Sequence, residues 1–215
     1  MDTHNQDKLN PTFAQKTVLF EGTLGIIGAL GAWITGLALW NAVIPETISD
    51  FKTQAFWGLV LTVLLIAVMW AVQCLPFRGI QRLSTLSQRI IFPLLKHTTF
   101  MDRFCVCLSA GVGEELLFRG FIQTLIIVYW PWGTDWGLNA ILGIGVSAFL
   151  FGLGHSLTRS YTLIATGLGV SFGIVYYRTG ALLIPIIAHT LYDVWAMQQI
   201  LWQSRNDNLT DLDLP

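Results

Sequence analysis

Long apolar stretches separated by short polar segments occupy most of this chain. Six of them approach or exceed the roughly 20 residues that a helix needs to cross a bilayer core. They are Thr17–Val43, Thr53–Leu75, Phe104–Trp130, Gly137–His155, Tyr161–Tyr177 and Ala181–Trp202. The pattern therefore predicts an all-α fold, a polytopic transmembrane helix bundle of about six spans.

The segment between the second and third stretches has a different pattern. Its apolar residues recur at steps of three and four, and they are Ile80, Leu83, Leu86, Ile90 and Leu94. Arg82 and Arg89 lie on the opposite side of the same helix. We expect an amphipathic helix in the membrane interface. A seventh, shorter span is the less favoured alternative, because the polar face is continuous.

Composition supports a location in the membrane. Of 215 residues, 53% are hydrophobic and 12% are charged, about half the charge of a soluble domain. The net charge of −1 gives no basic field, so we expect membrane lipid and no nucleic acid as a partner. Three cysteines are too few for a disulfide scaffold.

Basic residues indicate the orientation and the domain limits. Pro76–Arg103 holds five of the twelve Lys and Arg residues, so we place this segment and both termini in the cytoplasm. Full inversion is the alternative. We expect a polar tail over 1–16, one membrane-embedded domain over 17–204 with a motif-bearing core at about 100–197, and an acidic tail over 205–215.

Ionisable residues inside the apolar stretches are few and concentrated. Glu21 lies near the cytoplasmic end of the first stretch. The others are Glu114, Glu115 and Arg119 in the third stretch, His155 in the fourth, and His189 and Asp193 in the sixth. A charge at mid-bilayer costs about 2.5–3.5 kcal/mol, so we expect these groups to form a polar site inside the bundle.

Helical spacing suggests which of these residues pair. Glu115 and Arg119 are four apart with the acid first, which favours a salt bridge with a mainly structural role. Glu114 is rotated by about 100° from Glu115 and is left unbridged, so it is the better candidate for a general base. His189 and Asp193 also share a face, either as a structural polar pair or as part of a site.

These residues form three motifs in order along the chain, namely Glu114-Glu115-x-x-x-Arg119, Phe151-x-x-x-His155 and His189-x-x-x-Asp193. They resemble the EExxxR, FxxxH and HxxxN or HxxxD motifs of the CPBP intramembrane proteases. That family, also called Abi, comprises CAAX proteases and bacteriocin-processing enzymes, including type 2 CAAX prenyl endopeptidases and lysostaphin-resistance-protein-A-like proteins. The resemblance covers about half the chain.

The resemblance implies a glutamate-dependent endopeptidase of a bacterial inner membrane, acting on a membrane-associated, prenylated or leader-type protein or peptide. It implies that Glu114 activates water with help from His155, and that His189 and Asp193 stabilise the oxyanion. Glu115, Arg119 and Phe151 would support the site, Phe151 as an apolar wall. The acid at Asp193 is a poorer oxyanion donor than Asn, so we favour a role in orienting His189.

The cofactor question has two readings. We expect no cofactor, because the chain has no HExxH motif. Zinc is the alternative, with Glu114, His155 and His189 as a ligand set that leaves a fourth position open for water.

Two functions of other classes stay open. A non-catalytic membrane scaffold or immunity protein could use the same fold to bind another protein. A proton- or cation-coupled transporter would also need acids and imidazoles in the membrane. The sequence shows neither paired repeats nor a broken-helix signal near Glu114, which disfavours the transporter.

Overall fold

A computed structural model describes residues 12–74, 76, 79, 83, 85–130 and 136–210, without the side chains of 136 and 205–210. The regular structure of these residues is helical throughout, which confirms the all-α fold class. In chain order the elements are α1 (Phe13–Ile34), α2 (Leu39–Val43), α3 (Ile48–Gln73), η2 (Ser87–Ile91), α5 (Phe92–Leu95), α6 (Phe100–Glu115), η3 (Leu116–Gln123), α7 (Thr124–Tyr129), α8 (Trp136–Gly154), α9 (Arg159–Thr179) and α10 (Leu183–Thr210).

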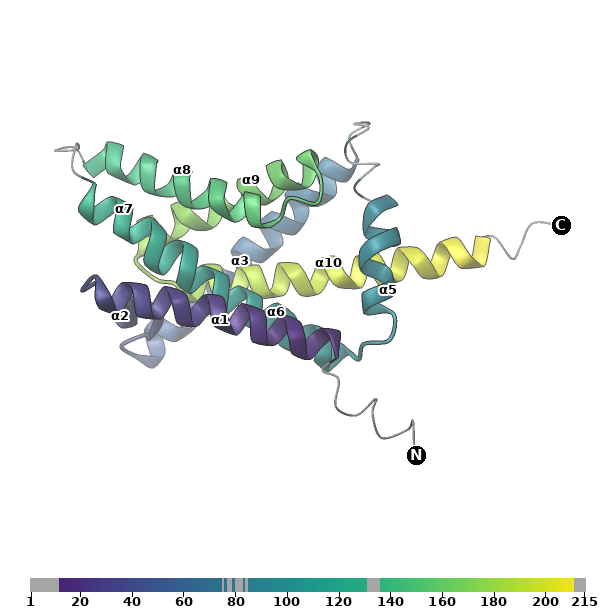
Figure 1. Cartoon of the computed structure of the whole chain (residues 1–215), viewed down its shortest axis with the longest axis horizontal. Coiled ribbons are helices and arrows are strands. Elements are labelled where there is room, and N and C mark those ends of the chain that lie inside the picture. The colour runs from purple at the N-terminus through teal and green to yellow at the C-terminus, as the bar shows by residue number, and fades with distance from the viewer. Residues whose placement is uncertain are drawn as a thin grey trace, which may run out of the picture.

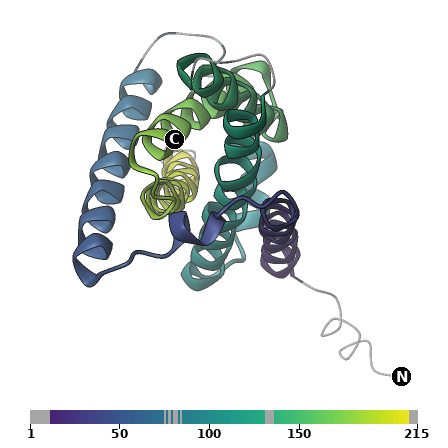
Figure 2. The ribbon, with the colours of Figure 1, turned by 90° about the vertical axis from the view of Figure 1, so that its left-hand side faces the viewer.

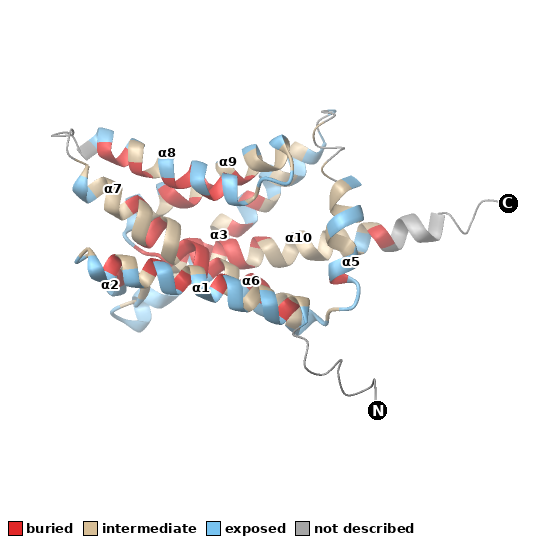
Figure 3. Cartoon of the chain, in the orientation of Figure 1, coloured by how far each residue is buried: buried red, intermediate tan, exposed pale blue. Residues whose placement is uncertain are grey.

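Helix α10 is the central element of the bundle (Figures 1 and 2). It packs between α3 and α6, while α1 lies along α6 and η3, and α8 pairs with α9. Buried residues concentrate on the helix faces that meet in this interior (Figure 3). The two buried apolar clusters both involve α10, one together with α1 and α2 and the other together with α3 and α9.

Three helices are long and apolar enough to cross a membrane, namely Phe13–Ile34, Ile48–Gln73 and Gly137–Gly154. The protein is thus an integral membrane protein, as the sequence predicted, whereas the count of six spans stays a prediction. The third predicted stretch forms one helical run made of α6, η3 and α7, in which η3 is π-helical.

The first predicted stretch is wrong as a single helix over Thr17–Val43. Helix α1 ends at Ile34, and the chain turns at Gly36, whose φ of 73° suits glycine. Leu39 in α2 then joins a buried cluster with Ala32 and Leu182. The apolar residues after Ile34 thus pack on the bundle instead of extending the helix.

The predicted amphipathic helix is only partly within the described residues. Ile80 and Arg82 lie outside them, whereas η2 and α5 are helical. Ile90 and Leu94 of the predicted apolar stripe are 45% and 44% exposed, and Leu95 is the buried residue. These two stripe residues therefore point away from the protein interior, whereas Leu95 packs into it. An interfacial location stays a prediction.

Glycines allow α1 to approach α6 closely. A Cβ atom at Gly28 would lie 2.7 Å from backbone atoms of Leu116 and Leu117, and one at Gly113 would overlap the carbonyl oxygen of Glu21. Small residues permit such contact between helix backbones in lipid. The contact places α1 directly beside the end of α6 that carries the acidic pair.

A capping box starts α6 and sets its position along the bundle. The Thr99 side chain accepts a hydrogen bond from the Asp102 backbone N–H, and the Asp102 carboxylate accepts one from the Thr99 backbone N–H. Hydrogen bonds from the backbone and hydroxyl of Thr99 lower the pKa of the exposed Asp102 carboxyl. The helix begins at Phe100 for this reason and ends at Glu115.

Candidate active site

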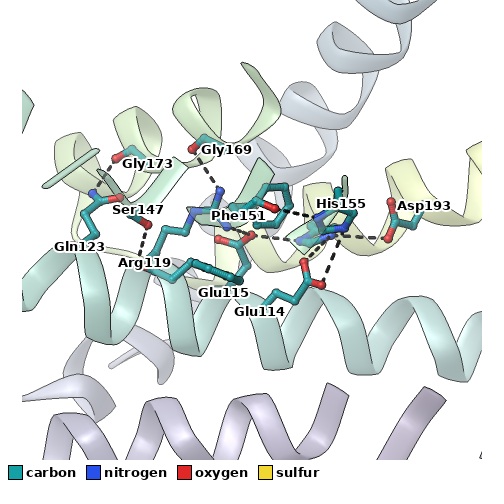
Figure 4. A network of polar contacts seen from close by, with 12 residues as sticks. Glu114, Glu115, Arg119, Gln123, Ser147, Phe151, His155, Gly169, Gly173 and Asp193 are labelled. Carbon is teal, nitrogen blue, oxygen red and sulfur yellow. Dashed lines mark hydrogen bonds and ion pairs between the residues drawn. The ribbon is translucent and has the colours of Figure 1, made fainter. Parts of the chain in front are cut away.

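The two histidines of the bundle converge on Glu114. Nε2 of His155 lies 3.8 Å from Glu114 Oε1, and Nε2 of His189 lies 3.8 Å from Glu114 Oε2 (Figure 4). Both distances are within the range of about 6 Å over which such groups couple. Residues of α6 and α10 and of the turn directly after α8 thus meet at one point, as the sequence analysis expected.

Hydrogen bonds to the other ring nitrogens orient both imidazoles. Nδ1 of His155 lies 2.9 Å from the Phe151 carbonyl oxygen, which can only accept, so Nδ1 carries the proton. Nδ1 of His189 donates in the same way to Glu115 Oε1 at 3.0 Å. Each Nε2 therefore faces Glu114. Glu115 and Phe151 are the residues that fix this orientation.

Arg119 anchors the wall behind the histidines. It is fully buried, donates to Glu115 Oε1 at 2.8 Å and to the Gly169 carbonyl oxygen at 3.1 Å, and lies over the ring of Phe151. The salt bridge predicted from the four-residue spacing is present. Phe151 in turn packs against the His155 ring at 4.6 Å between centroids. The positions of Glu115 and Phe151 both depend on Arg119.

A π-helical segment follows the acidic pair directly. η3 begins at Leu116, the residue after Glu115, and Arg119 lies within it. π-Helical turns are rare and occur mostly at functional sites. The widened turn is an irregularity near Glu114 that the sequence did not reveal.

Exposure rises from Glu114 toward Asp193. The side chains of Glu114 and His189 are 9% and 3% exposed, whereas those of His155 and Asp193 are 26% and 31% exposed. Asp193 Oδ2 lies 3.5 Å from Nε2 of His189, so the pair expected from their spacing is in contact. His155 and Asp193 thus form the accessible side of the cluster.

A cavity of about 400 Å³ adjoins this accessible side. Its walls come from α3, the segment before α5, and α8, α9 and α10. His155, His189 and Asp193 line it, and most of the other lining residues are apolar or aromatic. Glu114 is not among the residues that line it, so its carboxylate lies behind the two imidazoles as seen from the cavity.

The sequence analysis missed two aromatic residues of this wall. Tyr161 meets the His155 ring edge-on, with 5.9 Å between ring centroids, and Phe172 stacks on His189 at 5.3 Å. Gly169 of α9 also belongs to this wall, because its carbonyl oxygen accepts a hydrogen bond from Arg119. Aromatic residues are frequent in every apolar stretch of this chain, so no sequence signal distinguished these two.

The arrangement does not match a metal centre. No group of three or more His, Cys, Asp or Glu within the described part of the chain is arranged to hold a metal ion. Glu114, His155 and His189, the set considered for zinc, contact one another as an acid between two imidazoles. We therefore assign no step to a metal.

Fold and site together define an all-helical membrane protein with a carboxylate–imidazole cluster beside an apolar cavity. Residues 96–195, slightly under half of the chain, match the family model described as type II CAAX prenyl endopeptidase Rce1-like. This match supports the CPBP family of CAAX-type proteases, which the three motifs resemble. No match was found among curated proteins or solved structures.

Proposed function

We propose that this protein is an intramembrane, glutamate-dependent endopeptidase. Its substrate would be a membrane-associated protein or peptide of the prenylated or leader type. The observation that carries the proposal is the Glu114 carboxylate, held 3.8 Å from each of two oriented imidazole nitrogens. The match of residues 96–195 to a CAAX-type protease family model supports it.

In the proposed reaction, Glu114 and His155 hold a water molecule between them. Glu114 takes a proton from this water while the water oxygen attacks the scissile carbonyl carbon. A positioned general base contributes roughly 10²–10⁴-fold to the rate of such a step. When the tetrahedral intermediate collapses, the C–N bond breaks, and the proton on Glu114 passes to the leaving amine. Water is consumed, and Glu114 returns to its initial state.

His189 would stabilise the oxyanion of that intermediate. Its Nδ1 donates to Glu115, and its Nε2 faces both Glu114 and Asp193, so acidic groups surround the ring. In the imidazolium form both ring nitrogens carry protons, and Nε2–H can donate toward the cavity. Asp193, which cannot donate when ionised, would act by orienting His189.

The cavity suits a chain that is partly apolar. It is lined mainly by apolar and aromatic side chains, and Leu83, Ser87 and Ile91 of the basic segment form one edge. We infer that substrate reaches the site from the side of this segment, which we place in the cytoplasm with both termini. The bacterial inner membrane is the proposed location.

Cleavage of a reporter peptide tests the proposal. Purified protein in liposomes would be given an internally quenched peptide ending in a prenylated CAAX sequence, and a second peptide with an apolar leader segment. We expect wild type to cleave at least one of them, Glu114→Ala to cleave neither, and the exposed-acid control Glu46→Ala to match wild type. Equal cleavage by Glu114→Ala and wild type would remove Glu114 from catalysis.

Metal content is a separate test. We propose metal-independent hydrolysis and expect no stoichiometric zinc in active protein, measured by elemental analysis of the preparation that cleaves. One tightly bound zinc per chain, lost in Glu114→Ala, would contradict this part of the proposal.

A non-catalytic scaffold is the second candidate. The observation favouring it is that Glu114 does not line the cavity and is only 9% exposed. A scaffold would keep its cellular effect when Glu114 is replaced by Ala, whereas a peptidase would lose it. Complementation of a deletion strain by the two forms separates the candidates.

A further inference from the structure

Glu21 is a buried acid that the proposed reaction does not use. It lies on α1, outside the segment 96–195 that matches the family model. It is 8% exposed, and its Oε2 atom has no hydrogen-bond partner among the described residues. An acid at such a position is costly unless a protein group or water satisfies it. The presence of a buried acid at position 21 therefore needs a physical explanation.

The helix crossing brings Glu21 to the acidic pair. The carbonyl oxygen of Glu21 lies so close to Gly113 that no Cβ atom would fit there. One turn later, a Cβ at Gly25 would lie 3.2 Å from the Cα atom of Gly113. Gly113 directly precedes Glu114. The backbone of α1 at Glu21 thus lies against Gly113, the residue before Glu114.

The electrostatic neighbours of Glu21 are the residues of the site itself. They are Glu114 from α6, His155 directly after α8, and His189 and Asp193 from α10. Glu21, on α1, is therefore within electrostatic range of the same centre. It does not line the cavity within the described part of the chain, so it has no direct route to a substrate there.

Buried carboxylate oxygens in this region lack hydrogen-bond partners among the described residues, and they belong to Glu21, Glu114 and Glu115. Glu114 Oε2, like Glu21 Oε2, makes no hydrogen bond to a described protein atom, and its contact with His189 Nε2 is 3.8 Å long. Nearly all buried polar atoms have a partner, and an ordered water serves where the protein offers none. A water molecule has two hydrogens, so one water can donate to both carboxyl groups.

We propose that Glu21 is a positioning residue of the active site. Through one bridging water it holds the Glu114 carboxylate in the orientation that faces both imidazoles. The inference rests on the proposed peptidase function and deepens it by adding a residue of α1 to a site otherwise built from α6, α8, α10 and η3. Glu21 acts through Glu114 and does not touch the substrate.

Two substitutions separate positioning from packing. In Glu21→Leu the side chain keeps an apolar bulk but cannot hold a water. In Glu21→Gln an amide oxygen can still accept from the water. Thr23→Leu places the same leucine two residues away at an exposed position of α1 and serves as the matched control.

The experiment measures kcat, KM and the apparent melting temperature of these variants in liposomes with the cleaved reporter peptide. Loss of a hydrogen bond to a charged group corresponds to roughly a ten- to hundredfold change in rate. We expect Glu21→Leu to lower kcat by about this factor with little change in KM. Its melting temperature should be equal or higher, since an apolar side chain is cheaper to bury than an acid. Glu21→Gln should lie between Glu21→Leu and wild type, and Thr23→Leu should match wild type.

Each other outcome overturns the inference. If Glu21→Leu keeps the wild-type kcat, or loses activity only together with its melting temperature, Glu21 has no positioning role. If wild type shows cleavage that depends on Glu114 while Glu21→Leu is unaffected, the proposed function stands and this inference alone fails. If wild type cleaves no reporter, both fail together.

Discussion

The guanidinium of Arg119 is fully buried, and both of its terminal nitrogens donate hydrogen bonds. Glu115 and the Gly169 carbonyl accept its hydrogen bonds, and the rings of Phe151 and Phe172 lie against its faces. Arg suits this position because its planar group combines donors with stacking, which Lys cannot do. A single cation, Arg119, therefore holds the side chains behind the two histidines in position.

Removing that cation should destabilise the protein. In Arg119→Met the Glu115 carboxylate loses its ion-pair partner in a buried position, which typically costs about 3–5 kcal/mol. The free energy of unfolding of the purified protein in mixed micelles would measure this loss of stability. Arg178→Met, at an exposed position, is the matched control and should change stability little. Equal stability of the two variants would show that the buried pair contributes nothing.

Asp193 provides a second test at this scale. If it orients His189, Asp193→Asn should retain activity within about tenfold, because the amide oxygen can still accept from Nε2–H. Asp193→Ala should lose roughly ten- to hundredfold in kcat. The two variants are compared in the same reporter assay. Equal losses in both would show that the negative charge, and not orientation, is what matters.

The sequence predicted the contacts that depend on local spacing. Four-residue spacing placed Glu115 with Arg119 and His189 with Asp193, and both contacts are present. It could not predict Phe172 against His189, because that contact joins two helices and depends on how they pack. Local periodicity carries no information about such pairs.

At the scale of elements, the run from α6 through η3 to α7 carries most of the site. The apolar pattern predicted this run as one helix, and it is continuous. The pattern did not predict that η3 would be π-helical, nor that α1 would end before Gly36. The same apolar pattern is compatible with an α-helical or a π-helical turn and with an earlier or later helix end. Tertiary packing decides between these alternatives.

The crossing of α1 and α6 can be tested at Gly113. In Gly113→Ala the new methyl group would overlap the Glu21 carbonyl oxygen, so α1 must shift. Overpacking of this kind costs typically about 1–3 kcal/mol, and we expect reduced activity as well, since Glu114 is the next residue. The control is Gly22→Ala on α1, where a Cβ atom meets nothing within 4 Å. Melting temperatures of both variants measure the effect, and a wild-type value for Gly113→Ala would contradict the close crossing.

At the scale of the whole molecule, four helices bring polar groups to one end of an apolar cavity. The sequence indicated that scattered ionisable residues must meet inside the bundle, because lipid offers them no other partner. It did not indicate that Glu114 would lie behind the histidines and outside the cavity wall. That placement follows from the rotation of α6 against α10, which only the assembled bundle determines.

Filling the cavity should block substrate without unfolding the protein. Ala196 lines the cavity, and Ala196→Phe would occupy part of its roughly 400 Å³. We expect kcat/KM to fall about tenfold or more, which corresponds to about 1.4 kcal/mol of lost binding. Ala71→Phe, at an exposed position of α3, is the control and should cleave normally. An unchanged kcat/KM in Ala196→Phe would show that the substrate does not use this cavity.

The central claim is that the Glu114 carboxylate activates water between two imidazoles. Its most direct test is the single-turnover cleavage rate of Glu114→Gln, which keeps the shape of the side chain but cannot take a proton. The rate should fall by roughly 10²–10⁴-fold while the protein stays folded and still binds the reporter peptide. Cleavage by Glu114→Gln at the wild-type rate would contradict the account.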